Sequence, residues 1–134
     1  MYTIKEVANL LNLTEHTIRF YTDRGLVPNL QRDTNNHRIF NDEAVNWLKA
    51  AKNLKKCGMR IEDIKKYVDL CLIGNDSILE RYKMIKEQKE QVLKQLEESK
   101  SMAEFIEKKE KHYLTIVNEK VKDNTNPYFW EVKT

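Results

Sequence analysis

The chain of 134 residues contains only three glycines, two prolines and two cysteines. So few turn-forming residues favour long helices over a β fold with many tight turns. Cys57 and Cys71 are typical of a reducing cytoplasm, where thiols stay free. No apolar run approaches the roughly 20 residues that span a bilayer, and the first residues, MYTIKEVANLL, do not resemble a signal peptide. We therefore expect a cytoplasmic protein with no membrane partner.

The sequence also lacks the residue clusters on which most catalysis and metal binding depend. It contains no cluster of His, Cys and carboxylate residues, no glycine-rich phosphate loop and no nucleophile motif. His112 stands alone and is interpreted as a surface residue. We expect neither an enzyme nor a bound metal or other cofactor.

Charge is plentiful but unevenly distributed. Charged residues make up 34% of the chain and the net charge is +3. Residues 1–75 hold 12 Lys/Arg against 9 Asp/Glu, whereas residues 76–134 hold 12 of each. An acidic partner such as a phosphate backbone would therefore meet the first half of the chain.

The stretch from Thr3 to Gly25, TIKEVANLLNLTEHTIRFYTDRG, predicts two short helices joined by a tight turn. Thr3 and Glu6 are spaced as a capping box, Thr14 can cap the second helix, and Gly25 stands where that helix would end. The inward face of the second helix would carry Ile18 and Tyr21, and its exposed face His16, Thr17, Arg19 and Phe20. Such a polar, partly basic face suits a DNA major groove, although similar helix pairs also occur in domains that never touch DNA.

Residues 32–40, RDTNNHRIF, predict a β-hairpin whose turn is formed by Asn35 and Asn36. Arg32, His37 and Arg38 would cluster on this hairpin, or wing. Basic residues on a wing beside a helix-turn-helix can bind the phosphates that flank the groove. The alternative is a solvated loop.

Two more helices are expected after the hairpin. One begins at Asn41 or Asp42, runs to about Cys57 and is stopped by Gly58, and the next begins at about Ile61. Residues 72–76, LIGND, are the natural boundary after them.

The longest regular stretch covers about residues 77–120 and contains no glycine or proline. Its apolar seam is interrupted by Lys89, Ser99 and Glu110. A narrow seam of this kind needs a partner helix, and we interpret it as a homodimeric coiled coil. The seam residues recur at three- and four-residue steps: Tyr82, Ile85, Val92, Leu96, Ala103, Ile106, Tyr113 and Val117.

The last segment, residues 121–134, opens with a loop and contains three consecutive aromatic residues, Tyr128, Phe129 and Trp130. They would either fasten the tail to the dimer or to the DNA-binding part, or form one wall of an apolar ligand pocket.

With these elements in order, the chain resembles the MerR family of bacterial transcription regulators. The resemblance is carried by YTIKEVANLLNLTEHTIRFYTDRGLVP, by R-x₅-R-I-F before a helix cap, and by LKKCGMRIEDIKK. The expected fold is mainly α: a winged helix-turn-helix domain over residues 1–71, a linker over 72–76, a dimerisation helix over 77–120 and a tail over 121–134.

The resemblance implies a homodimer on a pseudo-palindromic operator in double-stranded promoter DNA. In this family the dimer bends and untwists the promoter in response to an effector, which can be a small molecule, and so brings the promoter elements into phase for RNA polymerase. Deforming DNA in this way costs several kcal/mol, which phosphate contacts must offset.

The resemblance carries Thr17, Arg19, Tyr21 and Arg38 over as DNA-binding residues, and His16 and His37 are added as local candidates. Thr17 and His16 are expected at base edges, and Arg19, Tyr21 and Arg38 at phosphates. Where the family often has a serine cap on the fourth helix, this chain has Arg60, which cannot cap by accepting a hydrogen bond but could reach a phosphate.

The sequence departs from the family at the sensor positions. Ser77 stands where metal-sensing members carry a cysteine, and no cysteine follows Cys71. Cys57 is a candidate redox sensor, lying one turn beyond the cysteine of aldehyde- or thiol-stress-sensing members, and its alternative is a buried structural thiol. Two rival functions remain: an architectural DNA-binding protein and a coiled-coil protein that does not bind DNA.

Overall fold

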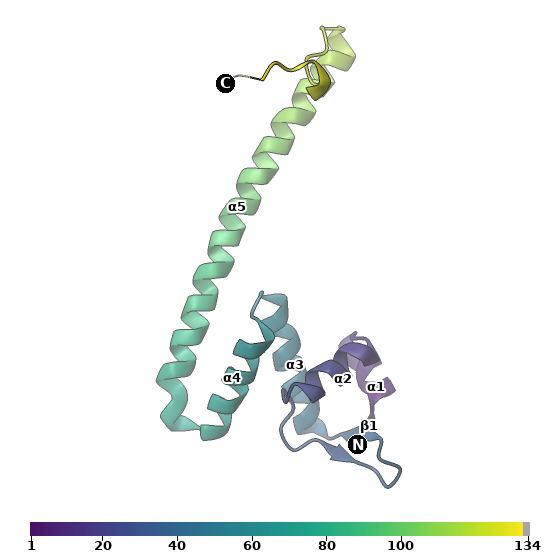
Figure 1. Cartoon of the computed structure of the whole chain (residues 1–134), viewed down its shortest axis with the longest axis vertical. Helices are drawn as coiled ribbons and strands as arrows, with labels where there is room; N and C mark the ends of the chain where they lie inside the picture. The colour runs from purple at the N-terminus through teal and green to yellow at the C-terminus, as the bar shows by residue number, and fades with distance from the viewer. Residues whose placement is uncertain (133–134) are drawn as a thin grey trace. The chain divides into compact units, whose positions relative to one another are not determined.

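The computed structural model describes residues 1–132 and contains two compact units, residues 1–92 and the chain from residue 93 onward. The first unit contains every strand of the described chain and all of its helices and 3-10 turns except η2 (Pro127–Phe129) and the later turns of α5 (Ile78–Glu119). Its elements are β1 (Tyr2–Thr3), α1 (Ile4–Leu11), α2 (Glu15–Asp23), β2 (Gln31–Arg32), β3 (Arg38–Phe40), α3 (Asp42–Lys56), α4 (Ile61–Ile73), the 3-10 turn η1 (Asn75–Ser77) and the first turns of α5 (Ile78–Glu119) (Figure 1).

Side-chain caps set the starts of α1 and α2. The Thr3 hydroxyl accepts from the Glu6 backbone N–H, and the Glu6 carboxylate accepts from the Thr3 N–H, both at 3.2 Å. The Thr14 hydroxyl accepts from the Thr17 N–H at 3.0 Å and so caps α2. Asn12, in the left-handed region with φ 53°, makes the corner between the helices. The predicted capping box, second cap and helix pair are confirmed.

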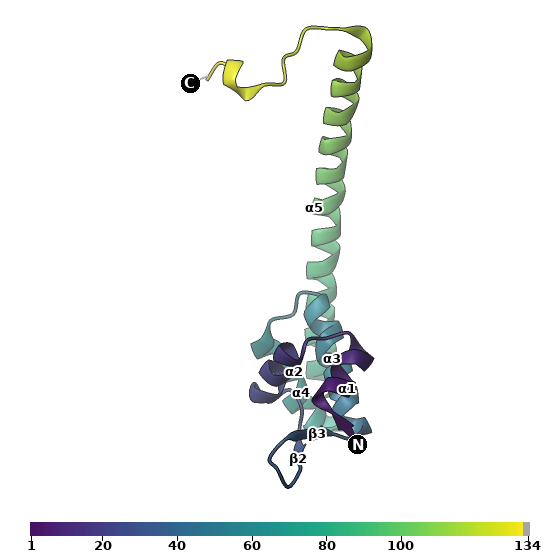
Figure 2. The same cartoon turned by 90° about the vertical axis from the view of Figure 1, so that its right-hand side faces the viewer.

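The wing is part of a three-stranded antiparallel sheet in the order β1-β3-β2. Its strands β2 and β3 are labelled in Figure 2. The predicted hairpin is present, and Asn36 takes φ 65° at its tip. β1 was not predicted: Tyr2 pairs with Phe40 and Thr3 with Ile39. A strand of two residues carries no period-2 pattern, so only the tertiary fold reveals this pairing. It joins the wing to the start of α1.

The third and fourth helices lie close to their predicted positions. The Asn41 side chain accepts from the Ala44 N–H at 2.8 Å, and α3 stops before Gly58, which takes φ 86°. Arg60 precedes α4 and makes no side-chain cap, as expected. The core between these helices, α1, α2 and the sheet is apolar. Its largest fully buried side chains are Phe40, Ile18, Leu26, Leu48, Ile64 and Val7.

The junction between α4 and α5 is held by polar contacts. Ser77 is buried, and its hydroxyl lies within hydrogen-bond distance of the Leu70 and Gly74 carbonyls. Arg81 donates to Ser77 Oγ at 3.0 Å and to the Gly74 carbonyl at 3.1 Å. Gln88 on α5 donates to the Cys57 carbonyl at 2.7 Å, which ties the first turns of α5 to the end of α3.

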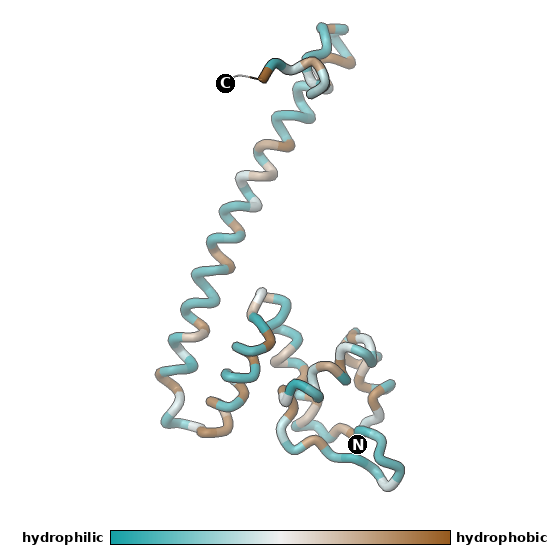
Figure 3. The backbone as a smooth tube through the Cα atoms, in the orientation of Figure 1, coloured by the Kyte–Doolittle hydropathy of each residue, from teal (hydrophilic) through white to brown (hydrophobic). Residues whose placement is uncertain are grey.

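α5 contains 42 residues and none of them is buried. Figure 3 shows apolar residues recurring as brown bands along this otherwise hydrophilic helix. The large side chains of the predicted seam are exposed, from Tyr82 to Val117. The predicted long helix is therefore confirmed, and the single chain leaves its apolar stripe without a partner.

In the second unit, the tail folds back on the last turns of α5. Trp130 Nε1 donates to the Asn124 carbonyl at 3.0 Å, and the Lys109 ammonium lies 5.9 Å from the Trp130 ring centroid. The 3-10 turn η2 (Pro127–Phe129) contains two of the three aromatic residues. All three rings remain exposed in the single chain, and both predicted roles for them stay predictions.

Candidate nucleic-acid interface

The outward face of α2 carries the polar side chains that the sequence placed there. His16 and Arg19 are exposed, and Thr17 is half-buried. The Thr14 hydroxyl donates to the Thr17 hydroxyl at 2.8 Å, so the hydroxyl proton of Thr17 stays available to donate to an acceptor on a base edge.

Arg19 makes one weak ion pair. Its Nη2 lies 3.4 Å from Glu15 Oε1, and both side chains are nearly half exposed. A surface pair of this kind contributes only about 0–1 kcal/mol, so the guanidinium can exchange Glu15 for a phosphate at small cost.

Tyr21 belongs to the core, as its predicted inward position requires. Its side chain is buried, and burial raises the pKa of the phenol. Within residues 1–132 no hydrogen bond to its hydroxyl is present, and every fully buried side-chain N or O atom has a partner. The hydroxyl therefore keeps some solvent access and is the one part of Tyr21 that can contact a phosphate.

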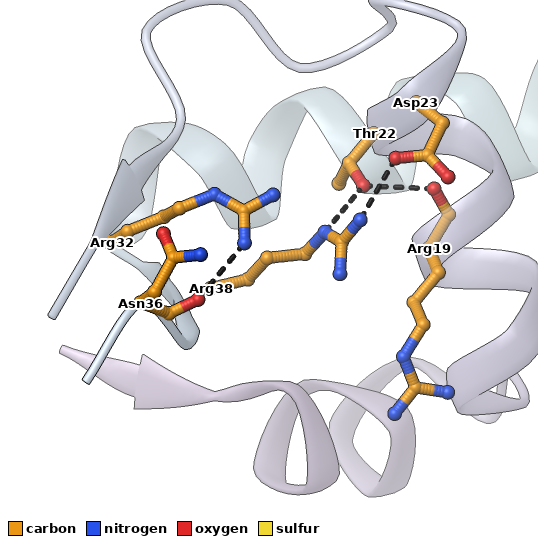
Figure 4. A network of polar contacts seen from close by, with 6 residues as sticks. All are labelled: Arg19, Thr22, Asp23, Arg32, Asn36 and Arg38. Carbon is orange, nitrogen blue, oxygen red and sulfur yellow. Dashed lines mark hydrogen bonds and ion pairs between the residues drawn. The ribbon is translucent and has the colours of Figure 1, made fainter.

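The wing residue Arg38 points back toward α2, not outward (Figure 4). Its Nε donates to Thr22 Oγ1 at 3.0 Å and its Nη2 donates to Asp23 Oδ1 at 2.8 Å. The Thr22 hydroxyl in turn donates to the Arg19 carbonyl at 2.8 Å. Only 19% of the Arg38 side chain is exposed, and two of its five N–H donors are used inside the chain. Three donors remain for a phosphate.

Three residues near the end of α2 were not among the sequence-predicted site residues. Thr22 and Asp23 bind Arg38, and Arg24 lies over the exposed Phe20 ring with its guanidinium carbon 4.9 Å from the ring centroid. The i, i+4 spacing of Phe20 and Arg24 could have indicated their contact. Nothing in the sequence indicated that Arg38, fifteen residues beyond Asp23, would bind there.

The wing tip is organised by Asp33. Its Oδ1 accepts from the backbone N–H groups of Asn35 at 2.9 Å and His37 at 2.8 Å. Arg32 Nη1 donates to the Asn36 carbonyl at 2.9 Å. The His37 ring is exposed and its Nδ1 lies 3.4 Å from Asp33 Oδ2. The predicted basic cluster is therefore divided: Arg32 and His37 surround the tip, and Arg38 belongs to the α2 contact.

The wing tip should lose its internal bonds at acid pH. The His37 backbone N–H, followed by that of Asn35, holds the pKa of the Asp33 carboxyl below its ordinary value of 3.8. Because the folded pKa is lowered, this stabilisation is fully present above 3.8 and is lost as the pH falls through the lowered pKa. An NMR titration of the Asp33 carboxyl carbon should give a midpoint below 3.8. In Asn35→Pro, which lacks one N–H donor, the midpoint should move back toward 3.8, and a wild-type midpoint at or above 3.8 would contradict the assignment.

Two other predicted site residues lie away from the Arg19–Arg38 network. Arg60 is exposed beside the start of α4, with its Nε 3.4 Å from Asp63 Oδ2, so it remains able to contact a phosphate. Cys57 is exposed at the end of α3. The interpretation of Cys57 as a buried structural thiol is therefore wrong, because the chain turns at Gly58 and leaves this side chain outside the core. Its role as a redox sensor stays a prediction.

Other classes of site have no counterpart in the part of the chain that the structure describes. Residues 1–132 contain no group of three or more His, Cys, Asp and Glu side chains placed to hold a metal ion. None of their helices has the length and apolarity to cross a bilayer. His112 is exposed, as predicted, and its Nε2 lies 2.5 Å from Asn124 Oδ1.

Comparison with known proteins identifies close relatives. Residues 2–71 match the model of the MerR HTH family of regulatory proteins. An uncharacterised HTH-type transcriptional regulator of Haemophilus influenzae is 35% identical over 108 residues, which is 81% of this chain and 80% of that protein.

Solved structures agree with the sequence matches. HiNmlR, a MerR family regulator lacking the sensor domain and bound to promoter DNA, superposes with a TM-score of 0.75 at 34% identity, over 86% of this chain and 91% of that one. A MerR family transcriptional regulator from Bacillus thuringiensis superposes with a TM-score of 0.73 at 38% identity, over 84% of this chain and 98% of that one.

Proposed function

Because this chain belongs to the MerR family of helix-turn-helix regulatory proteins, which are DNA-binding transcription regulators and not enzymes, we propose that it binds promoter DNA as a homodimer. The dimer bends and untwists the promoter for RNA polymerase in response to an effector. HiNmlR, which is similar over most of both chains and is bound to promoter DNA, supports DNA as the partner.

The observation that carries the DNA-binding part is the link between α2 and the wing. Arg38 on β3 donates to the Thr22 hydroxyl, which donates to the backbone carbonyl of Arg19, so the Arg38 side chain is held against the turn of α2 that carries Arg19. His16 and Thr17 lie on the same helix three and two residues before Arg19, where base edges would be reached. Arg60, His37 and the Tyr21 hydroxyl are further phosphate contacts in this proposal.

The dimer is supported by the exposed stripe on α5. None of the 42 residues of α5 is buried by its own chain, and its apolar residues recur at coiled-coil spacing. A second copy offers the same stripe, and a paired α5 would present two α2 helices to two half-sites of one operator. The sequence suggested two routes for the effector: an apolar ligand pocket with one wall formed by Tyr128, Phe129 and Trp130, and oxidation of Cys57, which is exposed.

Fluorescence anisotropy with the duplex upstream of the protein's own gene tests this function. We expect specific binding whose affinity falls with salt, with a logarithmic slope of about −0.9 for each phosphate neutralised. Energy transfer between dyes on the two duplex ends should rise on binding, because a bent duplex brings its ends closer. A scrambled duplex of equal length is the control. Equal affinity for both duplexes, or a salt slope near zero, would refute the regulator and favour a coiled-coil protein that does not read DNA.

A further inference from the structure

The wing and α2 are connected by one polar network, which contains two residues with no role in the DNA contacts proposed above. These residues are Thr22 and Asp23, at the last turn of α2. They bind Arg38 Nε and Nη2 at 3.0 and 2.8 Å (Figure 4). Within residues 1–132 no other hydrogen bond joins the wing to α2, and β3 packs mainly against β1, β2, α1 and α3. The polar link from the wing to α2 therefore runs through Arg38.

The partners of Arg38 are suited to hold it in place. A hydrogen bond with an ionised partner is shorter and stronger than a neutral one. The Arg38 side chain, which is 19% exposed, is sheltered from water, whereas that of Asp23 is 64% exposed. The Thr22 hydroxyl accepts from Arg38 and donates to the Arg19 carbonyl, so its position is set from both sides. The orientation of the guanidinium is thereby determined by α2.

Neither stabilisation of the helix nor attraction to DNA explains why an aspartate stands at position 23. It is the last residue of α2, where the helix dipole disfavours a negative charge. A carboxylate beside a phosphate-binding surface also repels DNA. Its 2.8 Å bond to Arg38 is the one side-chain hydrogen bond that Asp23 makes among the described residues.

We propose that Thr22 and Asp23 are positioning residues for DNA binding, which act through Arg38 to hold the wing in place against the end of α2 before DNA arrives. The proposal rests on the DNA-binding function proposed above. A wing held in this way loses less conformational freedom on binding, so more of the contact energy appears as affinity. Thr22 and Asp23 themselves make no contact with DNA in this proposal.

Asp23 can affect DNA binding in two ways, by repelling phosphates with its charge or by positioning Arg38, and the two predict opposite changes in affinity when the carboxylate is removed. If only charge mattered, Asp23→Ala would strengthen DNA binding, because a negative charge is removed. If position matters, Asp23→Ala should weaken binding to an operator selected by the wild-type protein from a randomised duplex library severalfold, because each protomer of the dimer loses one partly exposed ion pair. Glu62→Gln is the matched control: it removes an exposed carboxylate of α4 that holds no part of the wing, and its affinity should stay equal or rise slightly.

Two variants of Thr22 give a second and independent measurement. Thr22→Val keeps the shape of the side chain and removes the hydroxyl, so it should weaken operator binding severalfold. Thr22→Ser restores the hydroxyl and should restore the affinity, which a merely structural role for the methyl group would not do. These two variants decide the matter if Asp23→Ala proves poorly folded.

A measurement without DNA separates this proposal from the proposed function. In the free protein, the NMR signal of Arg38 Nε–H should exchange slowly with water, and it should exchange faster in Thr22→Val and Asp23→Ala while residues 31–40 become more mobile. If Arg38 Nε–H exchanges faster in the two variants but the wild-type protein binds no operator, Thr22 and Asp23 still position the wing, and the proposed DNA-binding function is refuted. Operator affinity of Asp23→Ala equal to or above wild type, or unchanged Arg38 exchange and wing mobility, would overturn the positioning role.

Discussion

Replacing Arg19 with alanine should weaken operator binding by about two orders of magnitude and leave the domain folded. Arg19 is exposed on α2 and its partner is the equally exposed Glu15 at 3.4 Å, so its removal costs the fold little. A phosphate contact by a charged donor contributes roughly 1.5 kcal/mol, and a dimer would lose two of them, about 3 kcal/mol together. That loss corresponds to about a hundredfold in the dissociation constant.

The salt dependence identifies the kind of contact that is lost. If Arg19 binds phosphates, the variant should weaken binding to every duplex and reduce the magnitude of the logarithmic salt slope by roughly 2, about 1 for each protomer. Glu15→Gln is the control, because it breaks the same ion pair but keeps the guanidinium, and its affinity should be equal or higher. Wild-type affinity and an unchanged slope in Arg19→Ala would remove Arg19 from the interface.

Placing a charge in the α5 seam, as in Leu96→Glu, should dissociate the dimer. Leu96 lies in the middle of the apolar stripe and is 62% exposed in the single chain, so the substitution costs the monomer little. In a paired α5 it would bury two carboxylates without partners, at a cost of several kcal/mol. We expect the dimer dissociation constant to rise by at least about a thousandfold, which corresponds to roughly 4 kcal/mol.

Sedimentation equilibrium at micromolar concentration checks this result. Leu96→Glu should sediment as a monomer, and its helix content should fall, because a long helix with an uncovered narrow stripe is marginal in water. The matched control is Gln91→Glu, which adds the same charge to α5 at a position outside the seam and should remain dimeric. A dimer that persists in Leu96→Glu would show that the seam is wrongly placed.

Local signals allowed most of the DNA-binding fold to be predicted from the sequence. Thr3, Glu6 and Thr14 cap helices through bonds that span three residues, so short windows of sequence contain all of the information. Glycines with positive φ at 25 and 58 marked chain reversals for the same reason. The long α5 followed from a regular apolar period and the absence of glycine and proline.

The candidate site was less predictable because its decisive contacts join distant positions. Arg38 was expected to point outward to phosphates, but its contacts to Thr22 and Asp23 exist only because the sheet brings the wing beside α2. The exposure of Cys57 likewise depends on how the chain leaves α3. Such contacts leave no trace in periodicity or in spacing along the chain.

The sequence by itself determined the helices, their caps, the presence of a wing, the family, and which face of α2 carries Thr17 and Arg19. These features depend on bonds between near neighbours and on the hydrophobic period, both of which are written locally in the chain. Only the tertiary structure decided that Tyr2 and Thr3 form a strand with Ile39 and Phe40, that Arg38 binds the end of α2, and that Cys57 is exposed. Those outcomes depend on which surfaces the buried core brings together, and the core is a property of the whole domain.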